Sequence, residues 1–283
     1  MLLSSIIHLQ ALERGALPQY LAPALRAEFL NWIGEKNKAQ SDLLHDGNEL
    51  RPYTVSDLTG TFRSQNGFNL AEAGQKAWFR VTSLTDKQTR LLREEVFPKI
   101  VNQEIKLNNV RCKVLTIAEQ HPWVRHTSYI DLVEKYFNQN DSLSDSFMVK
   151  FNSLTTFSTG DLQVPLPNPK TVVSSWLTRW NKFSRESGVN LPERLKELKA
   201  SELKEAKLVL NRYALETTTF QYKPIKWVGF TGKCYYRVLA KDEFWMRTCQ
   251  LLADFSFYCG TGKNTSFGLG QTRKINELDW KNS

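Results

Sequence analysis

The stretch best suited to bind a ligand is the glycine-rich segment YCGTGKNTSFGLGQTRKI, which begins at Tyr258. Its glycines are Gly260, Gly262, Gly268 and Gly270. Glycine adopts positive φ at no steric cost and lets another backbone approach closely, so a G-x-G pair at each end of a polar stretch predicts a shaped loop. Its backbone N–H groups and the side chains of Lys263, Asn264, Thr265 and Ser266 suit phosphate oxygens.

The spacing in this segment is G-x-G-x-x-x-x-x-G-x-G, which matches neither a Walker A loop nor a dinucleotide-binding loop. We therefore expect no nucleotide cofactor. Two interpretations stay open from the residues alone. The segment is either a loop that receives phosphates or a glycine-rich turn with no ligand.

Basic side chains accompany a predicted helix in the segment PLPNPKTVVSSWLTRWNKFSRE. Trp176 and Trp180 belong to its apolar stripe, and Arg179, Lys182 and Arg185 are predicted on the opposite, exposed side. These cations and Arg273, just after the glycine loop, could follow the phosphates of a polyanion, whereas a charged helix face is often only solvated.

The composition bounds the class of protein. The chain has 283 residues, enough for one large or two ordinary domains, and a formal net charge of +9. Such a charge favours a polyanionic partner. Its four cysteines are far apart and show no C-x-x-C spacing, which indicates reduced thiols in a cytoplasmic protein and no metal site. No apolar run is long enough to cross a bilayer, so we expect no role in a membrane.

Periodicity predicts the same order of elements twice. In the first half we expect a strand over 2–12, a helix over 18–38, and two strands in RPYTVSDLTG and KAWFRVTSLT. A helix over 87–105, bent or broken at Pro98, and a strand in NNVRCKVLTIAE follow. The order β-α-β-β-α-β is ferredoxin-like, as in RNA-recognition domains. The second half echoes it, and the glycine loop is predicted to join the last helix of the second half to its last strand, in QTRKINEL.

The predicted fold class is therefore α+β, with two tandem ferredoxin-like (RRM-like) domains and a C-terminal glycine-rich loop. We expect an N-terminal domain at 1–120, a linker with a short helix at 121–144, and a C-terminal domain at 145–283 that carries the loop. The strands lack an RNP1-like run, which argues against a general RNA-recognition protein that stacks bases on its sheet.

Five blocks together resemble the CRISPR-associated endoribonuclease of family six, which trims precursor CRISPR RNA. They are LLHDGNELRPYTVSDLTG, MVKFNSLTTFSTGD, PLPNPKTVVSSWLTRWN, WVGFTGKCYYRV and the glycine loop. The resemblance implies cleavage of CRISPR repeat RNA, hairpin or single-stranded, without a metal or other cofactor. The 2′-hydroxyl would attack the adjacent phosphate to leave a 2′,3′-cyclic phosphate and a 5′-hydroxyl.

The resemblance also selects the catalytic candidates. His45 lies in the first block, in a predicted polar loop, and its imidazole suits proton transfer near neutrality. Asp46 is either its orienting partner or a bystander, Arg51 would hold the phosphate, and no tyrosine is a clear second proton-transfer group. His8 is expected on the polar side of the first strand, and His121 and His126 in the solvated linker. The alternative function is a noncatalytic RNA-binding subunit among the other subunits of a CRISPR effector complex.

Overall fold

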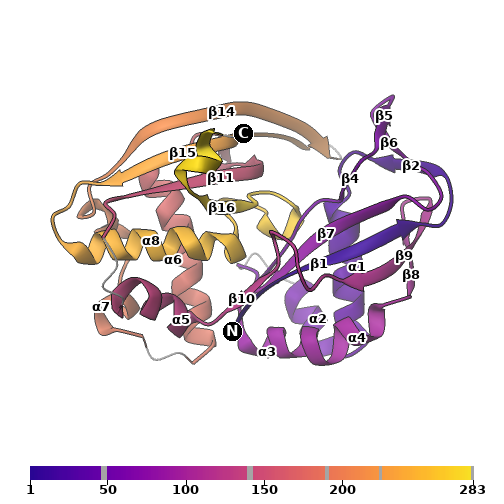
Figure 1. The fold of residues 1–283 in the computed structure, drawn as a ribbon, viewed down its shortest axis with the longest axis horizontal. Helices are drawn as coiled ribbons and strands as arrows, with labels where there is room; N and C mark the ends of the chain where they lie inside the picture. Colours follow the sequence, from indigo (N-terminus) through magenta and orange to yellow (C-terminus); the bar gives the residue numbers. More distant parts are fainter. Residues whose placement is uncertain (46–49, 139–142, 189–190, 223–224, 282–283) are drawn as a thin grey trace. The chain divides into compact units, whose positions relative to one another are not determined.

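The computed structural model describes residues 1–45, 50–138, 143–188, 191–222 and 225–281. The chain divides into two compact units (Figure 1). Unit 1 comprises Met1–His126 together with Ser266–Gly268, and unit 2 comprises Thr127–Thr265 together with Leu269–Ser283. Each unit mixes helices with an antiparallel sheet, so the predicted α+β class is confirmed.

Unit 1 is built on a sheet with the strand order β3-β7-β1-β9-β8. The strands of the unit are β1 (Leu2–Ala11), β2 (Gly15–Pro18), β3 (Tyr53–Val55), β4 (Thr59–Gly60), β5 (Arg63–Gln65), β6 (Phe68–Ala71), β7 (Lys76–Ser83), β8 (Glu104–Leu107) and β9 (Val110–Ile117), with β10 (Arg125–Thr127) at the unit boundary. The helical segments are α1 (Ala22–Gly34), α2 (Lys38–His45), α3 (Asp86–Arg90), the π-helix η1 (Leu91–Val96) and α4 (Phe97–Ile100). With β1 and β7 at the centre and helices between the strands, this is the predicted ferredoxin-like arrangement.

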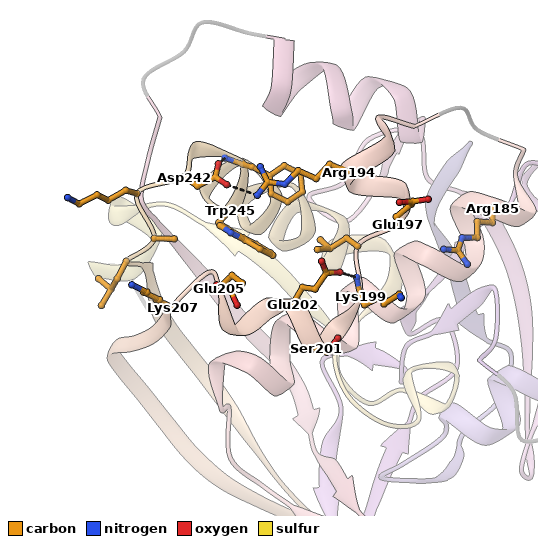
Figure 2. Close-up of a pocket in the computed structure, with 15 residues that line it drawn as sticks. Arg185, Arg194, Glu197, Lys199, Ser201, Glu202, Glu205, Lys207, Asp242 and Trp245 are labelled. Carbon is orange, nitrogen blue, oxygen red and sulfur yellow. Dashed lines mark hydrogen bonds and ion pairs between the residues drawn. The ribbon is translucent and has the colours of Figure 1, made fainter.

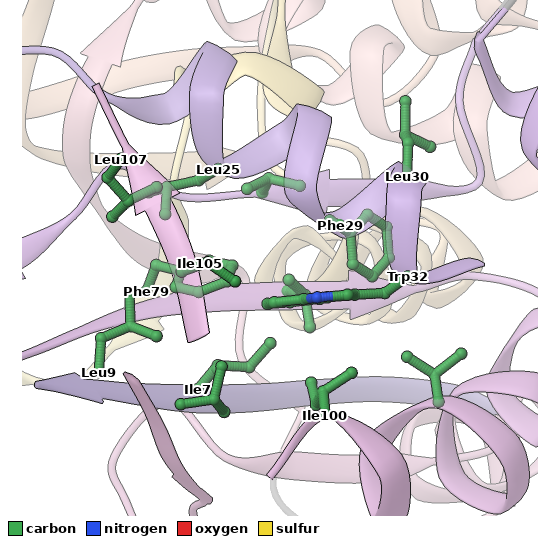
Figure 3. Packing of buried hydrophobic residues seen from close by; sticks show 14 of the residues in the cluster. Ile7, Leu9, Leu25, Phe29, Leu30, Trp32, Phe79, Ile100, Ile105 and Leu107 are labelled. Carbon is green, nitrogen blue, oxygen red and sulfur yellow. The ribbon is translucent and has the colours of Figure 1, made fainter. Parts of the chain in front are cut away.

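The core of unit 1 lies between the sheet and its helices (Figure 3). Ile7 and Leu9 project from β1 at the period of two that the sequence predicts, and both are buried. Phe29 and Trp32 of α1 pack toward them, and Phe79 of β7 lies 6.2 Å from Trp32 between ring centroids. One apolar helix stripe therefore covers one face of the sheet.

Unit 2 repeats the arrangement with the strand order β14-β15-β11-β16. Its strands are β11 (Ser146–Thr155), β12 (Phe157–Thr159), β13 (Leu162–Val164), β14 (Leu208–Tyr222), β15 (Ile225–Val238) and β16 (Thr272–Ile275). Its helical segments are α5 (Tyr129–Val133), the π-helix η2 (Glu134–Asn138), α6 (Pro169–Glu186), α7 (Glu193–Lys196), η3 (Ala200–Lys204), α8 (Glu243–Cys259), η4 (Thr265–Phe267, of which Thr265 alone is in this unit) and α9 (Glu277–Lys281). Helices α6 and α8 run side by side along one face of the sheet (Figure 1).

The segment expected as a linker, 121–144, is divided between the units, because His121–His126 count with unit 1 and the residues from Thr127 with unit 2. Its short helix is confirmed as α5, which Ser128 begins with a capping box. Tyr129 of α5 is fully buried, and its ring lies 5.0 Å from Trp180 and 5.8 Å from Phe255. Aromatic packing therefore makes this part of the segment a component of the core of unit 2.

Three predicted elements of unit 1 differ from the structure. The first helix begins at Ala22, because Pro18 ends β2 and the Asp57 carboxylate accepts a hydrogen bond from the Leu21 N–H at 2.8 Å, at the start of α1. The helix predicted over 87–105 ends at Ile100, and a turn at Asn102 leads into β8. The polar loop predicted around His45 is helix α2, in which Asn37 accepts a hydrogen bond from the Gln40 N–H at 3.0 Å.

None of the helices in the described ranges is both long and apolar enough to span a membrane.

We expect Phe79→Ala to lower the free energy of unfolding by about 3–5 kcal/mol, because it opens a cavity beside Trp32 in the core of unit 1. Phe68→Ala is the matched control, since Phe68 is 44% exposed on β6 and its loss should change stability by no more than about 0.5–1 kcal/mol. Urea denaturation of both variants measures the difference. Equal losses would contradict the assignment of Phe79 to the core.

Candidate functional site

The glycine segment is closed by its own backbone in unit 2. Helix α8 ends at Cys259, and the Thr261 N–H donates to the Gly270 carbonyl at 2.8 Å, which joins the two ends of the loop. The Lys263 N–H donates to the Thr156 carbonyl at 2.9 Å, and the Gly270 N–H donates to the Leu154 carbonyl at 2.9 Å. These bonds attach the base of the loop to the end of β11.

The space that the glycines leave is filled by protein atoms. A Cβ on Gly262 would lie 2.3 Å from the Thr156 carbonyl oxygen, and one on Gly270 would lie 2.0 Å from that of Thr261. Both glycines have positive φ, of 77° and 68°. A Cβ on Gly268 would lie 2.6 Å from the Ala22 Cβ in unit 1. The close approach of protein to protein therefore explains these glycines.

Two side chains of α6 hold the closed end of the loop. The Trp176 indole N–H donates to the Thr261 hydroxyl at 2.7 Å, and the Arg179 guanidinium donates to the Gly262 carbonyl at 2.6 Å. Arg179 is only 7% exposed and donates also to the Ser175 carbonyl at 2.9 Å. The expectation that Arg179 lies on an exposed face with Lys182 and Arg185 is therefore wrong, because Arg179 turns inward to satisfy loop and helix carbonyls.

The other predicted cations have different surroundings. Lys263 is exposed, one residue after Gly262, whereas Lys182 is half-buried beside the Phe183 ring. Arg185 is exposed and donates to the Lys196 carbonyl at 3.1 Å. Arg273 is half-buried on β16. Lys263 and Arg185 therefore have the greatest access to an external anion among these four.

The polar side chains at the tip of the loop are less accessible than the sequence suggests. Asn264 has a positive φ of 54° and its carbonyl accepts a hydrogen bond from the Leu269 N–H at 3.3 Å. Thr265 and Ser266 are each only 7% exposed. Their burial leaves the Lys263 side chain as the most exposed group of the loop.

Residues Ser266–Gly268 count with unit 1, where they meet polar side chains of α1 and its surroundings. The Tyr20 hydroxyl donates to the Phe267 carbonyl, and the Arg26 guanidinium carbon lies 4.5 Å from the centre of the Phe267 ring. The Arg26 side chain also donates to the Tyr53 hydroxyl at 2.9 Å. Arg26 is 8% exposed and Tyr53 is fully buried, so this is a buried cation held by an aromatic ring and a phenol.

His45 and Arg51 lie in the part of the unit 1 sequence whose residues surround the Tyr53 hydroxyl. His45 is the last residue of α2, but its side chain lies outside the described part of the chain, as does all of Asp46. The Tyr53 hydroxyl lies 3.5 Å from the carbonyl of Leu44, which precedes His45. Burial raises the pKa of Tyr53, and the charges of Arg26 and Arg51 oppose that rise. Arg51 is half-buried, and its electrostatic field reaches Tyr53.

Arg26, Tyr53 and Asp57 were missed as polar centres by the sequence analysis. Arg26 lies outside the apolar stripe of α1, which predicts exposure, and only its tertiary partners show that it is buried. The Asp57 carboxylate accepts hydrogen bonds from the N–H groups of Leu21 and Leu58, at 2.8 and 2.9 Å. Burial raises the pKa of Asp57 to about 6, although these backbone donors act in the opposite direction.

Two histidines expected to be solvated lie close to aromatic rings in unit 1. His121 meets Trp78 edge to face, with 4.8 Å between ring centroids. His8 pairs with Trp78 across β1 and β7, and both histidines are half-buried. Burial, with the nearby His8, lowers the pKa of His121. The solvated position expected for His121 is therefore wrong, because the residues after β9 pack on the sheet.

A wide pocket of about 1270 Å³ lies in unit 2 at the N-terminal end of α8 (Figure 2). Of the predicted site residues that the structure describes, Arg185 lines it. The Arg194 guanidinium pairs with Asp242 at 2.5 Å and lies 3.8 Å from the Phe244 ring centre. Both cations and carboxylates line this pocket, so its lining has no single sign of charge that would select a ligand.

Comparison with known proteins places the loop in a family context. Residues 149–272 match the family model described as CRISPR-associated endoribonuclease Cas6. This range contains α6 and the whole glycine loop, and the match confirms the resemblance that the sequence blocks indicate. No curated protein sequence matches the chain.

Solved structures of Cas6 proteins share the fold over nearly the whole chain. One Cas6 product complex is similar with a TM-score of 0.71 and 22% identity, covering 98% of this chain and 100% of that one. Thermus thermophilus Cas6 has a TM-score of 0.66 and 19% identity, covering 97% and 98%. A Cas6-related protein from Pyrococcus furiosus has a TM-score of 0.59 and 14% identity, covering 98% and 100%. At these identities the likeness establishes the fold, and it agrees with the tandem ferredoxin-like units.

We expect Gly262→Ala to destabilise the protein by at least twice as much as Gly160→Ala. Both glycines have positive φ, of 77° and 57°, but a Cβ meets the Thr156 carbonyl only at Gly262 and nothing within 4 Å at Gly160. The control should therefore lose only the conformational cost of about 1–2 kcal/mol. Chemical denaturation compares the two, and equal losses would show that the loop closure is not tight.

We expect Asp57→Asn to change how stability depends on pH. The folded pKa of about 6 lies above the ordinary value of 3.8, so the folded state binds a proton more tightly and gains stability from this group as the pH falls from 7 to 4. The gain, about 1–3 kcal/mol, should be absent in the variant. Unfolding free energies of both proteins across this pH range measure the difference, and parallel curves would contradict the assignment.

Proposed function

We propose that this chain, whose residues 149–272 match the Cas6 family model, is a metal-independent endoribonuclease that binds and cleaves CRISPR repeat RNA in the precursor transcript. The observation that carries the proposal is this match, because it includes the glycine loop and the α6 side chains that close it. Cas6 proteins in complexes described as product and substrate-mimic complexes have the same fold. In this proposal the substrate is repeat RNA and the product is guide RNA.

The reaction needs no redox change and no added nucleophile. The 2′-oxygen attacks the adjacent phosphorus and loses its proton to a base, while the bond from phosphorus to the 5′-oxygen breaks and that oxygen takes a proton from an acid. The products are a 2′,3′-cyclic phosphate and a 5′-hydroxyl. Proton transfer and cationic stabilisation of the phosphate are the two contributions that the protein must make.

His45 is the proposed proton-transfer group and Arg51 the proposed phosphate ligand. Support comes from the surroundings of the end of α2, where the buried pair of Arg26 and Tyr53 lies beside the Leu44 carbonyl. This pair would position the end of α2 and add positive charge near it. Arg26 is a positioning residue in this proposal, because its guanidinium is held by Tyr53 and the Phe267 ring.

RNA contacts are proposed for the exposed side chain of Lys263 and for Arg273, Lys182 and Arg185 in unit 2. The buried members of the predicted set act through the loop instead. Arg179, Thr265 and Ser266 are nearly inaccessible, and Gly260, Gly262, Gly268 and Gly270 allow the loop to close. Asn264 would shape the tip through its left-handed backbone. The shape of the loop therefore determines where the Lys263 ammonium lies, and this ammonium would bind phosphate.

Cleavage of cognate repeat RNA in excess EDTA tests the proposal. Wild type should give a discrete cut, whereas His45→Ala should lose about 10²- to 10⁴-fold in rate with binding retained. Arg51→Ala should lose about 10²-fold or more. A 2′-deoxy sugar before the scissile phosphate should abolish cutting without abolishing binding, because it removes the nucleophile.

His126→Ala is the matched control, since His126 is an exposed histidine outside the proposed site, and it should cut at the wild-type rate. Tight binding without any cutting by wild type would favour a noncatalytic RNA-binding subunit of an effector complex. Normal cutting by His45→Ala would leave the enzyme in place and refute the role of His45. Cutting that requires a divalent metal would refute the metal-independent route.

A further inference from the structure

Three cations stand side by side on the sheet of unit 2. Lys150 of β11 pairs directly with Lys233 of β15 and, on its other side, with Arg273 of β16. Their neighbours along β11, Val149 and Phe151, are buried beneath the helices. Because side chains alternate along a strand, the three cations share the sheet face opposite α6 and α8. We call them the cation row.

Such a row is costly unless an anion accompanies it. Directly opposed side chains in a sheet have Cβ atoms about 4.5–5.5 Å apart, and like charges in that position destabilise the pair. Partial burial lowers the pKa of Lys150, and the charges of Arg273 and Lys233 lower it further, while Asp279 opposes them. The one carboxylate among these influences comes from α9.

Helix α9 supplies the groups that meet the cation row within unit 2. The Lys233 ammonium donates to the carbonyls of Asp279 and Trp280, at 3.1 and 2.8 Å. The Trp280 ring lies 4.3 Å from the Arg212 guanidinium carbon, and Arg212 pairs with Glu277 at 3.6 Å. Figure 1 shows this helix in yellow beside β15. The helix thus presents backbone carbonyl oxygens to Lys233, and a carboxylate and a flat ring to Arg212.

A nucleotide strand also presents oxygens and flat rings, and its phosphate oxygens carry negative charge. A single RNA strand carries phosphates for the cations and bases that stack on aromatic and guanidinium planes, and a sheet face offers the flat surface on which unpaired bases spread. Tyr235 lies near Arg212 on this face, with 5.7 Å from the guanidinium carbon to the ring centre. The face therefore complements single-stranded RNA in charge and in stacking surface.

We propose that the cation row of Lys150, Lys233 and Arg273 binds the phosphates of a single-stranded RNA segment, and that α9 covers the row until this RNA displaces it. The inference rests on the proposed function only in taking RNA as the anionic partner. It assigns Lys150 and Lys233 to RNA binding and gives α9 a competing role. Helix α9 is then an internal competitor that lowers affinity for weakly bound strands.

The test measures binding of a fluorescein-labelled 12-nucleotide oligouridine, in EDTA, by anisotropy. A variant that ends at Asn276 lacks α9 and should bind at least about 5-fold more tightly than wild type. Trp280→Ala, which removes the ring contacts but keeps the helix residues, should shift affinity in the same direction. Glu94→Gln is the matched control for the shortened variant, because each change raises the net charge by one. Glu94 lies exposed on η1 of unit 1.

Lys150→Gln in the shortened variant should reverse the gain and reduce the slope of log affinity against log salt by about 0.7, the value for one lost contact to a single strand. Lys150→Arg should restore both. Lys106→Gln, at an exposed position of β8, should do neither. The proposal is overturned if the shortened variant binds like Glu94→Gln, if Lys150→Gln behaves like Lys106→Gln, or if no variant binds the oligouridine. If the oligouridine results are as expected but wild type does not cleave repeat RNA, the proposed endoribonuclease activity is refuted and RNA binding by the cation row is retained.

Discussion

The hydrogen bond from Arg179 to the Gly262 carbonyl is the interaction on which the position of the glycine loop depends. A buried guanidinium is tolerated only where its donors are satisfied, and here two carbonyls accept from it. Burial lowers the pKa of Arg179, yet its ordinary value is so high that the group stays charged. Removing it would leave the Gly262 carbonyl without this donor, one residue from the exposed Lys263. The packing of Arg179 therefore determines both the shape of the loop and the position of its accessible cation, Lys263.

The order of the main elements could be predicted from the sequence because each has a clear period. Leu3, Ile7 and Leu9 alternate along β1, and the Trp176 and Trp180 stripe of α6 is buried as expected. The first and last residues of the elements could not be predicted, because tertiary contacts determine them. Asp57, 36 residues along the chain from Leu21, caps the start of α1. The strand β8 follows a left-handed turn at Asn102, which hydrophobic periodicity does not predict. Local pattern identifies an element, and distant hydrogen bonds determine where it begins and ends.

The candidate site was predictable to a lesser degree, since it depends on which cations are buried. Arg26 and Arg179 both lie off an apolar stripe, which normally indicates an exposed charge. Each instead reaches an acceptor far away in sequence, the Tyr53 hydroxyl for Arg26 and the Gly262 carbonyl for Arg179. A long side chain with several donors can bury its stem and still satisfy its head. The glycines had a readable spacing, but the protein atoms that fill their space could be identified only from the fold.

The net charge of +9 therefore overstates the positive surface that an RNA would meet. Arg26 and Arg179 hold buried structure, and Lys233 is 6% exposed with its ammonium on the carbonyls of α9. Lys233 differs from Arg179 in its partners, which are backbone carbonyls of the short helix α9, whereas Arg179 donates to carbonyls of α6 and the glycine loop. Charges satisfied by core groups fix local shape, and in the displacement that we propose a charge satisfied by α9 becomes available to a stronger anion. The same type of side chain thus has two physical roles, and the stability of its partner decides between them.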